Sequence, residues 1–197
     1  GVYDRIEGDV CIRENGQMDV THDEDTTFGL DIVPYFAYLH QHPEKRMWMD
    51  IKNLDEENKE PFFVCLDSLC RTYEIARERL IVETPRWDLM RLLTIHDFCT
   101  SYYVDAPKPS ELTRRQMDSV ITRLDRVASS GCVRALSFPG WWYMALRGQY
   151  KERDISFLIW KHRSIQWEVF LCPEGKMMLA DDRVKAILVK DKGRYHR

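Results

Sequence analysis

Two short segments of the sequence carry ionisable side chains at alternating positions. Glu7 and Asp9 are separated by one glycine, and Asp50 and Lys52 are separated by one isoleucine. Successive side chains of a β-strand point to opposite faces, so each pair would project from a single face of its strand. An unpaired buried charge is costly, so these four groups must neutralise one another or share a ligand. Three carboxylates against one ammonium leave negative charge over, which favours Mg²⁺ or Ca²⁺ as that ligand.

The alternative explanation is a salt-bridge network that plugs the core of a barrel. Two neighbouring strands that both carry charged pairs are uncommon for packing alone, so we favour the metal site. Glu83 ends a further apolar segment, where it could support the site on the substrate side, hold Lys52 or act as a further metal ligand, the role that we rank last. His22 follows the first pair of acids after a short polar turn, which would return it to the mouth of the site as a general acid or base.

The elements that must position these residues follow an alternating pattern. Short segments rich in β-branched or aromatic residues predict strands over 4–12, 47–52, 80–84, 98–104, 134–138, 155–160 and 186–190. Helical patterns between them predict helices over 29–42, 55–73, 86–97, 112–130, 141–150, 164–171 and 174–181. Within the second helix, Asp55 is a candidate N-cap, and Pro61 marks either a late start or a kink.

This alternation predicts an α/β domain spanning residues 1–197, with a parallel sheet covered by helices. Seven strands fit a (β/α)8 TIM-type barrel lacking its first strand, or a doubly wound open sheet. Both architectures place their active sites at the carboxyl ends of the strands, which is where the charged pairs lie.

Composition restricts the possible partners. The chain of 197 residues has a formal net charge of −3, so it lacks the global basic field that would hold nucleic acid. No apolar segment approaches the roughly 18 residues of a membrane-spanning helix. The six cysteines form no CxxC pair and are expected to be buried thiols, which weakly favours a cytoplasmic location. A removed signal peptide would instead indicate a periplasmic or secreted protein, and the oligomeric state is left open.

Three motifs together resemble the glycerophosphodiester phosphodiesterase family, within the larger group of phospholipase-C-like barrels. They are Glu7-Gly8-Asp9, His22-Asp23 and Asp50-Ile51-Lys52, in that order and at compatible spacing. That family also carries a His-Arg pair on a preceding strand, and its third-strand acid is more usually Glu. Because residue 1 stands just before the second strand of the pattern, we expect an upstream segment that supplies the missing histidine.

The resemblance implies a role for each residue. The fold would be a (β/α)8 barrel in which Glu7, Asp9 and Asp50 hold Mg²⁺ or Ca²⁺. His22 and the absent histidine would form the acid–base pair, and Lys52 would neutralise charge in the transition state. The substrate would be a small glycerophosphodiester or sugar-linked phosphodiester, opened by hydrolysis or by internal attack that gives a cyclic phosphate.

Aromatic and basic residues at the ends of the later strands are expected to bind this substrate. With Glu83, these residues are Tyr103, Trp141, Trp160, Lys161 and Lys190. Two other functions remain open at this point. One is a non-catalytic barrel that binds phosphosugars or other anions in a degenerate site. The other is a sugar-processing barrel that uses Asp50 and Glu83 as a carboxylate pair.

Overall fold

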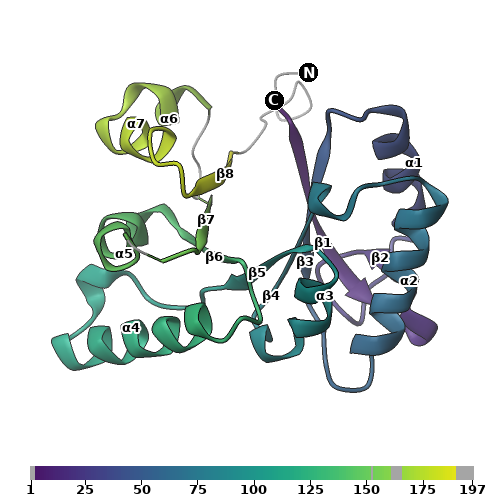
Figure 1. Cartoon of the computed structure of the whole chain (residues 1–197), viewed down its shortest axis with the longest axis horizontal. Coiled ribbons are helices and arrows are strands. Elements are labelled where there is room, and N and C mark those ends of the chain that lie inside the picture. Colours follow the sequence, from purple (N-terminus) through teal and green to yellow (C-terminus); the bar gives the residue numbers. More distant parts are fainter. Residues whose placement is uncertain (1–2, 152, 161–165, 190–197) are drawn as a thin grey trace. The chain divides into compact units, whose positions relative to one another are not determined.

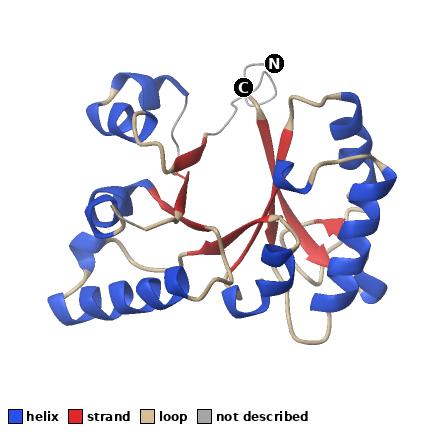
Figure 2. Ribbon diagram, in the orientation of Figure 1, coloured by secondary structure: helices blue, strands red, loops and turns tan. Residues whose placement is uncertain are grey.

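The computed structural model describes residues 3–151, 153–160 and 166–189, with Asn15 and Gln166 described by their backbones alone. Strands and helices alternate along the chain, which confirms the predicted α/β class (Figures 1 and 2). The chain divides into two compact units. The first contains Gly1–Tyr102 and Ser130–Val133, and the second contains Tyr103–Ser129 and Arg134–Arg197.

The sheet of the first unit is mixed rather than wholly parallel. Its strands are β1 (Arg5–Ile12), β2 (Met18–Val20), β3 (Arg46–Ile51), β4 (Leu80–Thr84) and β5 (Cys99–Tyr103). β1, β3, β4 and β5 pair in parallel in that order, and β2 pairs antiparallel with the last residues of β1. The sequence did not predict β2, because three residues are too few to show a strand period. The prediction of a strict (β/α)8 repeat is therefore wrong for this unit, although the alternation of strands and helices is consistent with a TIM-like barrel.

The helices of the first unit are α1 (Val33–Gln41), α2 (Lys59–Thr72) and α3 (Arg91–Ile95). α1 and α2 lie along one side of the strands and bury Phe36, Leu39, Phe62 and Leu66 (Figure 2). In the strands, Val10, Met49, Ile51 and Val82 are fully buried. The residues that alternate with this apolar set along β1 and β3 are the charged ones, as expected for strands with two different faces.

α2 begins four residues later than the sequence suggests. The Asp55 carboxylate accepts hydrogen bonds from the backbone N–H groups of Glu57 and Asn58, at 2.8 and 2.7 Å, and so closes a turn ahead of the helix. Asn58 occupies the N-cap position instead, so the prediction of Asp55 as N-cap is wrong. Pro61 lies in the first turn, where its missing N–H leaves no helical hydrogen bond unmade. The late start that Pro61 predicted is confirmed.

A short 3-10 turn, Glu14–Gly16, joins β1 to β2 and contacts the start of α2. Gly16 has φ +77°, and a Cβ atom there would lie 2.4 Å from the carbonyl oxygen of Pro61. No side chain fits this approach, and L residues avoid this φ. Gly16 therefore fixes where the chain turns after β1, and with it the start of the segment that carries His22.

The second unit contains β6 (Ala135–Pro139), β7 (Ser156–Trp160) and β8 (Val184–Leu188), paired in parallel in that order. Its helices are α4 (Arg114–Ser129), α5 (Tyr143–Gln149), α6 (Gln166–Leu171) and α7 (Pro173–Leu179). β8 begins two residues before its predicted start. Within the described part of the chain, no helix has both the length and the apolar character that crossing a bilayer requires.

Candidate active site

A row of polar side chains crosses the sheet of the first unit. In the register of the parallel ladders, Asp9 lies beside Asp50, Asp50 beside Glu83, and Glu83 beside Ser101. Residues in register on parallel strands point to the same face, so the row lies on one face of the sheet. Glu7 precedes Asp9 by two residues on β1 and shares that face. Asp50 and Glu83 are the next-to-last residues of β3 and β4, whereas Ser101 lies in the middle of β5 and Glu7 nearer the start of β1.

The structure brings together the two charged pairs of the sequence, Glu7 with Asp9 and Asp50 with Lys52. One carboxylate oxygen each from Glu7, Asp9 and Asp50 lies within 4.8 Å of the other two; we call this set the carboxylate cluster. The Nζ atom of Lys52 lies 2.7 Å from an oxygen of Asp9 and 2.6 Å from an oxygen of Asp50. Lys52 therefore bridges two members of the cluster, and one ammonium stands against three carboxyl groups.

The pKa values in the site reflect this imbalance. Burial, followed by repulsion from Asp9 and Asp50, raises the pKa of Glu7 to about 7. Burial also raises the pKa of Asp50, against the hydrogen bond that it accepts from Lys52. Burial alone would lower the pKa of Lys52, but its hydrogen bonds to Asp50 and Asp9 outweigh burial and raise it. The ammonium is thus held in its charged form, while the cluster lacks enough positive charge for all its carboxyl groups to ionise at neutral pH.

The carboxylate cluster fits a divalent cation. Oxygen ligands lie about 2.3–2.6 Å from Ca²⁺, so ligands on opposite sides of that ion are roughly 5 Å apart. Three oxygens within 4.8 Å of one another meet this limit without rearrangement, and Mg²⁺, at about 2.0–2.1 Å, would draw them slightly closer. Carboxylate oxygens are also the donors that both ions prefer. The positions and the chemistry of the three groups agree with the ligand set expected from the sequence.

His22 lies in the segment between β2 and α1, residues 21–32, which we call the His22 loop. Its side chain is 70% exposed, and Nδ1 lies 2.7 Å from an oxygen of Asp23. The ring lies near enough to Asp50 to lower the pKa of that carboxyl, as a minor contribution beside burial. Because Asp23 engages Nδ1, the other ring nitrogen is the one left to exchange a proton with a substrate. Its role as acid or base stays a prediction.

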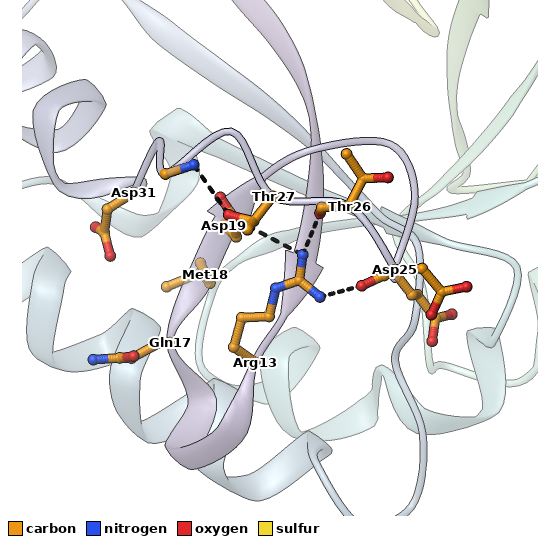
Figure 3. A pocket seen from close by; sticks show the side chains of 10 residues that line it. Arg13, Gln17, Met18, Asp19, Asp25, Thr26, Thr27 and Asp31 are labelled. Carbon is orange, nitrogen blue, oxygen red and sulfur yellow. Dashed lines mark hydrogen bonds and ion pairs between the residues drawn. The ribbon is translucent and has the colours of Figure 1, made fainter.

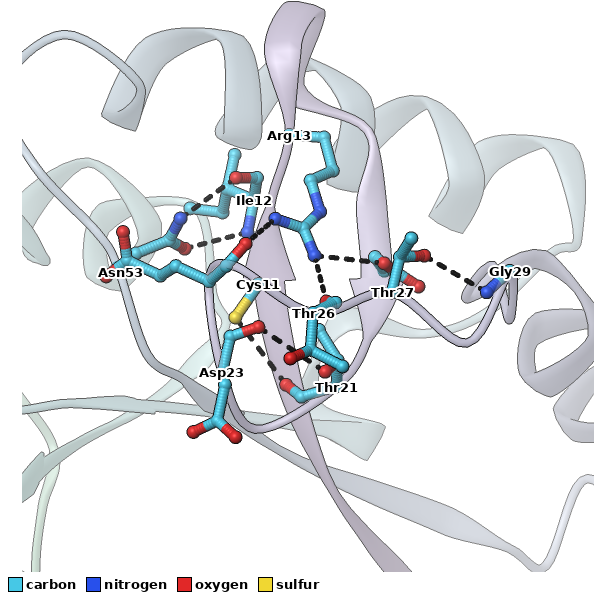
Figure 4. Close-up of polar contacts among 11 residues, drawn as sticks. Cys11, Ile12, Arg13, Thr21, Asp23, Thr26, Thr27, Gly29 and Asn53 are labelled. Atoms are coloured by element: carbon cyan, nitrogen blue, oxygen red, sulfur yellow. Dashed lines mark hydrogen bonds and ion pairs between the residues drawn. The ribbon is translucent and has the colours of Figure 1, made fainter.

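Asn53, which sequence reasoning missed, ties the end of β3 to the end of β1. Its side-chain oxygen accepts a hydrogen bond from the N–H of Ile12 at 2.7 Å, and its Nδ2 donates to the carbonyl of Ile12 at 2.9 Å (Figure 4). The amide thus imitates one more rung of the parallel ladder directly beyond Lys52. The available signal was an amide immediately after the Asp-x-Lys motif, where the strand must stop.

Arg13 was missed as well. Its guanidinium donates to the carbonyl of Thr26 at 2.6 Å, to the carboxylate of Asp19 at 3.1 Å, and to the carbonyl of Glu24 (Figures 3 and 4). These residues line a cavity of about 440 Å³ under the His22 loop. No member of the carboxylate cluster lines it, so the cavity and the cluster are separate features of the first unit.

Glu83 is 2% exposed and accepts a hydrogen bond from the Ser101 hydroxyl at 3.1 Å. The carboxylate cluster does not include Glu83, and metal ligation stays the least favoured of the roles expected for this residue. Its contribution to substrate binding stays a prediction.

The aromatic residues expected to bind substrate form a cluster in the second unit. Tyr103 stacks on Trp160 with ring centroids 5.6 Å apart, and Trp141 meets Trp160 edge-on at 6.2 Å. The ammonium of Lys108 lies 5.4 Å from the centroid of the Trp141 ring. Mutual stacking accounts for this arrangement, so binding of substrate by these rings remains a prediction. The other two residues expected to bind substrate, Lys161 and Lys190, lie outside the described residues.

Comparison with known proteins gives a result in structure alone. No protein-family model and no curated protein matches the sequence. A protein assigned as a glycerophosphoryl diester phosphodiesterase from Silicibacter pomeroyi superposes with a TM-score of 0.60 at 13% identity, over 93% of this chain and 79% of its own. A glycerophosphodiester phosphodiesterase from Parabacteroides distasonis gives 0.58 at 13% identity, over 92% and 77%.

A third solved structure, assigned to the same activity and from Galdieria sulphuraria, gives a TM-score of 0.60 at 12% identity, over 93% of this chain and 80% of its own. The chain has a glycerophosphodiester phosphodiesterase fold. This fold was the one that the three sequence motifs implied. At such low identity the likeness concerns the fold, and the chemistry must be argued from the side chains of the first unit.

Proposed function

We propose that this chain is a metal-dependent phosphodiesterase that acts on a glycerophosphodiester or a sugar-linked phosphodiester. The observation that carries the proposal is the carboxylate cluster bridged by Lys52. It lies on one face of the neighbouring strands β1 and β3, in a fold shared with glycerophosphodiester phosphodiesterases. The solved relatives support the cleavage of phosphodiesters in general, and the metal and the substrate are our extension.

In this proposal Glu7, Asp9 and Asp50 hold Mg²⁺ or Ca²⁺, which when bound polarises the phosphoryl group and activates a hydroxyl. Lys52 acts beside it. Because Asp9 and Asp50 hold its ammonium in place and raise its pKa, Lys52 is charged throughout the reaction. A fixed positive charge of this kind stabilises the negative charge that develops on phosphoryl oxygens, and it needs no reorganisation in the transition state.

His22 supplies the proton transfer. Asp23 holds the ring through Nδ1, so the remaining nitrogen takes a proton from the attacking oxygen or gives one to the leaving oxygen. Where the substrate carries a hydroxyl next to the phosphate, internal attack gives a cyclic phosphate. Where water attacks, the product is a phosphomonoester. Phosphorus NMR distinguishes these two products and so tells the cyclising reaction from hydrolysis.

The test is turnover of glycerophosphodiesters with choline, ethanolamine or sugar head groups, with Mg²⁺ or Ca²⁺ added to chelator-treated protein. We expect activity only with metal. Asp9→Asn should lower kcat/KM by a factor of about 100 or more, as expected for loss of a group that stabilises the transition state. The matched control is Asp88→Asn, an exposed carboxylate paired with Arg86, which should leave activity unchanged.

Full activity in Asp9→Asn would refute the proposal, and so would a lack of turnover with any metal in protein that carries the upstream histidine expected from the sequence. Calorimetric binding of a phosphosugar without turnover or metal dependence would favour the non-catalytic barrel instead.

A further inference from the structure

Arg13 directly follows β1, and its guanidinium donates hydrogen bonds to residues of the His22 loop (Figure 3). Two of its acceptors, the carbonyls of Glu24 and Thr26, follow His22 in the chain, and the third, the Asp19 carboxylate, precedes it. The guanidinium therefore ties the part of the loop that follows His22 to β2, the strand from which the loop begins. None of its hydrogen bonds goes to the carboxylate cluster or to Lys52.

The base of the loop is closed by backbone hydrogen bonds. The N–H of Val20 donates to the carbonyl of Leu30 at 2.8 Å, and the N–H of Ile32 donates to the carbonyl of Met18 at 3.1 Å. Asp19 and Asp31 form an isolated antiparallel bridge between these bonds. Above this closure the chain must cross from residue 21 to residue 29 without strand or helix, so its path there depends on side chains.

Asp19 is a buried carboxylate that forms an ion pair with Arg13. It is 7% exposed, and a hydrogen bond from the Thr27 side chain, together with Arg13, lowers its pKa. A buried carboxylate with a cationic partner fixes the guanidinium in one orientation. The nitrogen that donates to Asp19 then also donates to the carbonyl of Thr26, and the other terminal nitrogen donates to the carbonyl of Glu24.

His22 has little else to place it. Its side chain is 70% exposed, and its one hydrogen bond within the described residues goes to Asp23, its neighbour in the loop. The carbonyl of Asp23 accepts from the N–H of Thr26 at 3.1 Å, so the turn 23–26 that Arg13 holds is the turn that carries the partner of the imidazole. The backbone of this turn determines where the ring lies.

We propose that Arg13 is a positioning residue that sets His22 for proton transfer through the carbonyls of Glu24 and Thr26. The inference rests on the proposed function, in which His22 exchanges a proton with the substrate. A lysine cannot replace Arg13, because a single ammonium lacks the planar fork that reaches a carboxylate and two carbonyls together.

The first test is kinetic. Arg13→Ala and Arg13→Lys should lower kcat by about 10-fold to 100-fold, the effect of a displacement of roughly 1 Å in a catalytic group, with KM and the metal Kd unchanged. In a His22→Ala background the same substitutions should cost nothing further, because residues that act through one another are not additive. Arg79 is the matched control, since its guanidinium also donates to backbone carbonyls, those of Leu39, His42 and Lys45. Arg79→Ala should lower Tm without coupling to His22.

The second test needs no turnover. Mn²⁺ bound at the carboxylate cluster broadens the NMR signals of nearby protons steeply with proximity, so the His22 ring protons report their place relative to the metal. We expect strong broadening in the wild type, weaker broadening in Arg13→Ala, and no change in Arg79→Ala.

Equal broadening in Arg13→Ala and wild type overturns the inference, whatever the activity. So does an equal kcat penalty for Arg13→Ala with and without His22. By contrast, wild-type activity in His22→Ala, or turnover independent of metal, overturns the proposed function. Weakened broadening in Arg13→Ala would in that case still show that Arg13 positions the imidazole. Failure of Mn²⁺ to bind the protein would overturn both.

Discussion

Metal binding to this protein should release a proton near neutral pH. Glu7 is the origin, because burial and its two carboxylate neighbours raise its pKa to about 7 in the metal-free protein. A cation requires the carboxylate form, so binding must displace whatever proton Glu7 holds. The perturbation is therefore titration of the metal-free protein with Ca²⁺ or Mg²⁺ at a series of pH values.

The magnitude follows from that pKa. Glu7 is about nine-tenths protonated at pH 6, half at pH 7 and one-tenth at pH 8, so the proton released per ion should follow about 0.9, 0.5 and 0.1. Below pH 7 the apparent Kd should rise by about tenfold for each pH unit removed, and above pH 8 it should become flat. Asp50, whose pKa is also raised by burial, adds to the release at the acidic end.

The raised pKa of Glu7 also makes the stability of the metal-free protein depend on pH. The folded pKa of Glu7 lies above its ordinary value of 4.5, so between these values the folded state binds more protons than the unfolded state. The free energy of unfolding of the metal-free protein should therefore fall as the pH rises from about 4.5 to 7. Glu7→Gln removes the titrating group and should lose this part of the dependence.

Isothermal titration calorimetry in buffers of different ionisation enthalpy measures the protons released. Asp88→Asn is the control, since a hydrogen bond from Arg86 lowers the pKa of that exposed carboxyl and it carries no proton at these pH values. Release at pH 6 should persist in Asp88→Asn and disappear in Glu7→Gln. An affinity that is constant from pH 6 to pH 8 would show that Glu7 is not a ligand or that its pKa is not raised.

Three further predictions concern stability, each measured by urea unfolding. Lys52→Met leaves the two aspartates that it bridges unpaired and should cost about 3 kcal/mol without metal, and saturating Ca²⁺ should narrow the loss. A loss that Ca²⁺ does not narrow would contradict the shared site. Asn53→Ala removes both hydrogen bonds to Ile12 and should lower the free energy of unfolding by about 1–3 kcal/mol. An unchanged free energy of unfolding would show that these hydrogen bonds do not stabilise the end of the ladder. Gly29→Ala has open space and should cost about 1–2 kcal/mol for its positive φ, whereas Gly16→Ala meets a backbone carbonyl and should cost clearly more. Equal costs for the two glycines would refute the steric argument.

Strand alternation made the centre of the site predictable. The period of two is fixed by the pleat, so charged residues at 7, 9, 50 and 52 had to share a face once their segments were recognised as strands. The parallel register then brought the pairs together. The same reasoning could not find β2, whose three residues show no period.

Other features of the site could not be predicted from the sequence, for a different physical reason. Arg13 bonds chiefly to backbone carbonyls, and every residue of the loop offers one, so the sequence carries no mark of the partner. At the start of α2, Asp55 and Asn58 are both good caps, and the choice between them depends on a local turn rather than on residue type. The α/β class and the clustering of the three carboxyl groups could thus be predicted from residue periodicity, whereas the residues that support the site could not.

The ladder between β1 and β3 also has a consequence for how the protein is made. It joins segments separated by the 3-10 turn, β2 and α1, and it contains every member of the carboxylate cluster, with Lys52 directly after its last residue pair. Contacts between segments close in sequence form early in folding, and domains fold as they leave the ribosome. Every residue of the cluster and Lys52 has thus been synthesised before the rest of the unit, and pairing of β1 with β3 brings three acids against one ammonium. A cation present at that moment removes the repulsion between the first two parallel strands, so the supply of divalent metal during translation would bear on how much of the chain reaches its native state.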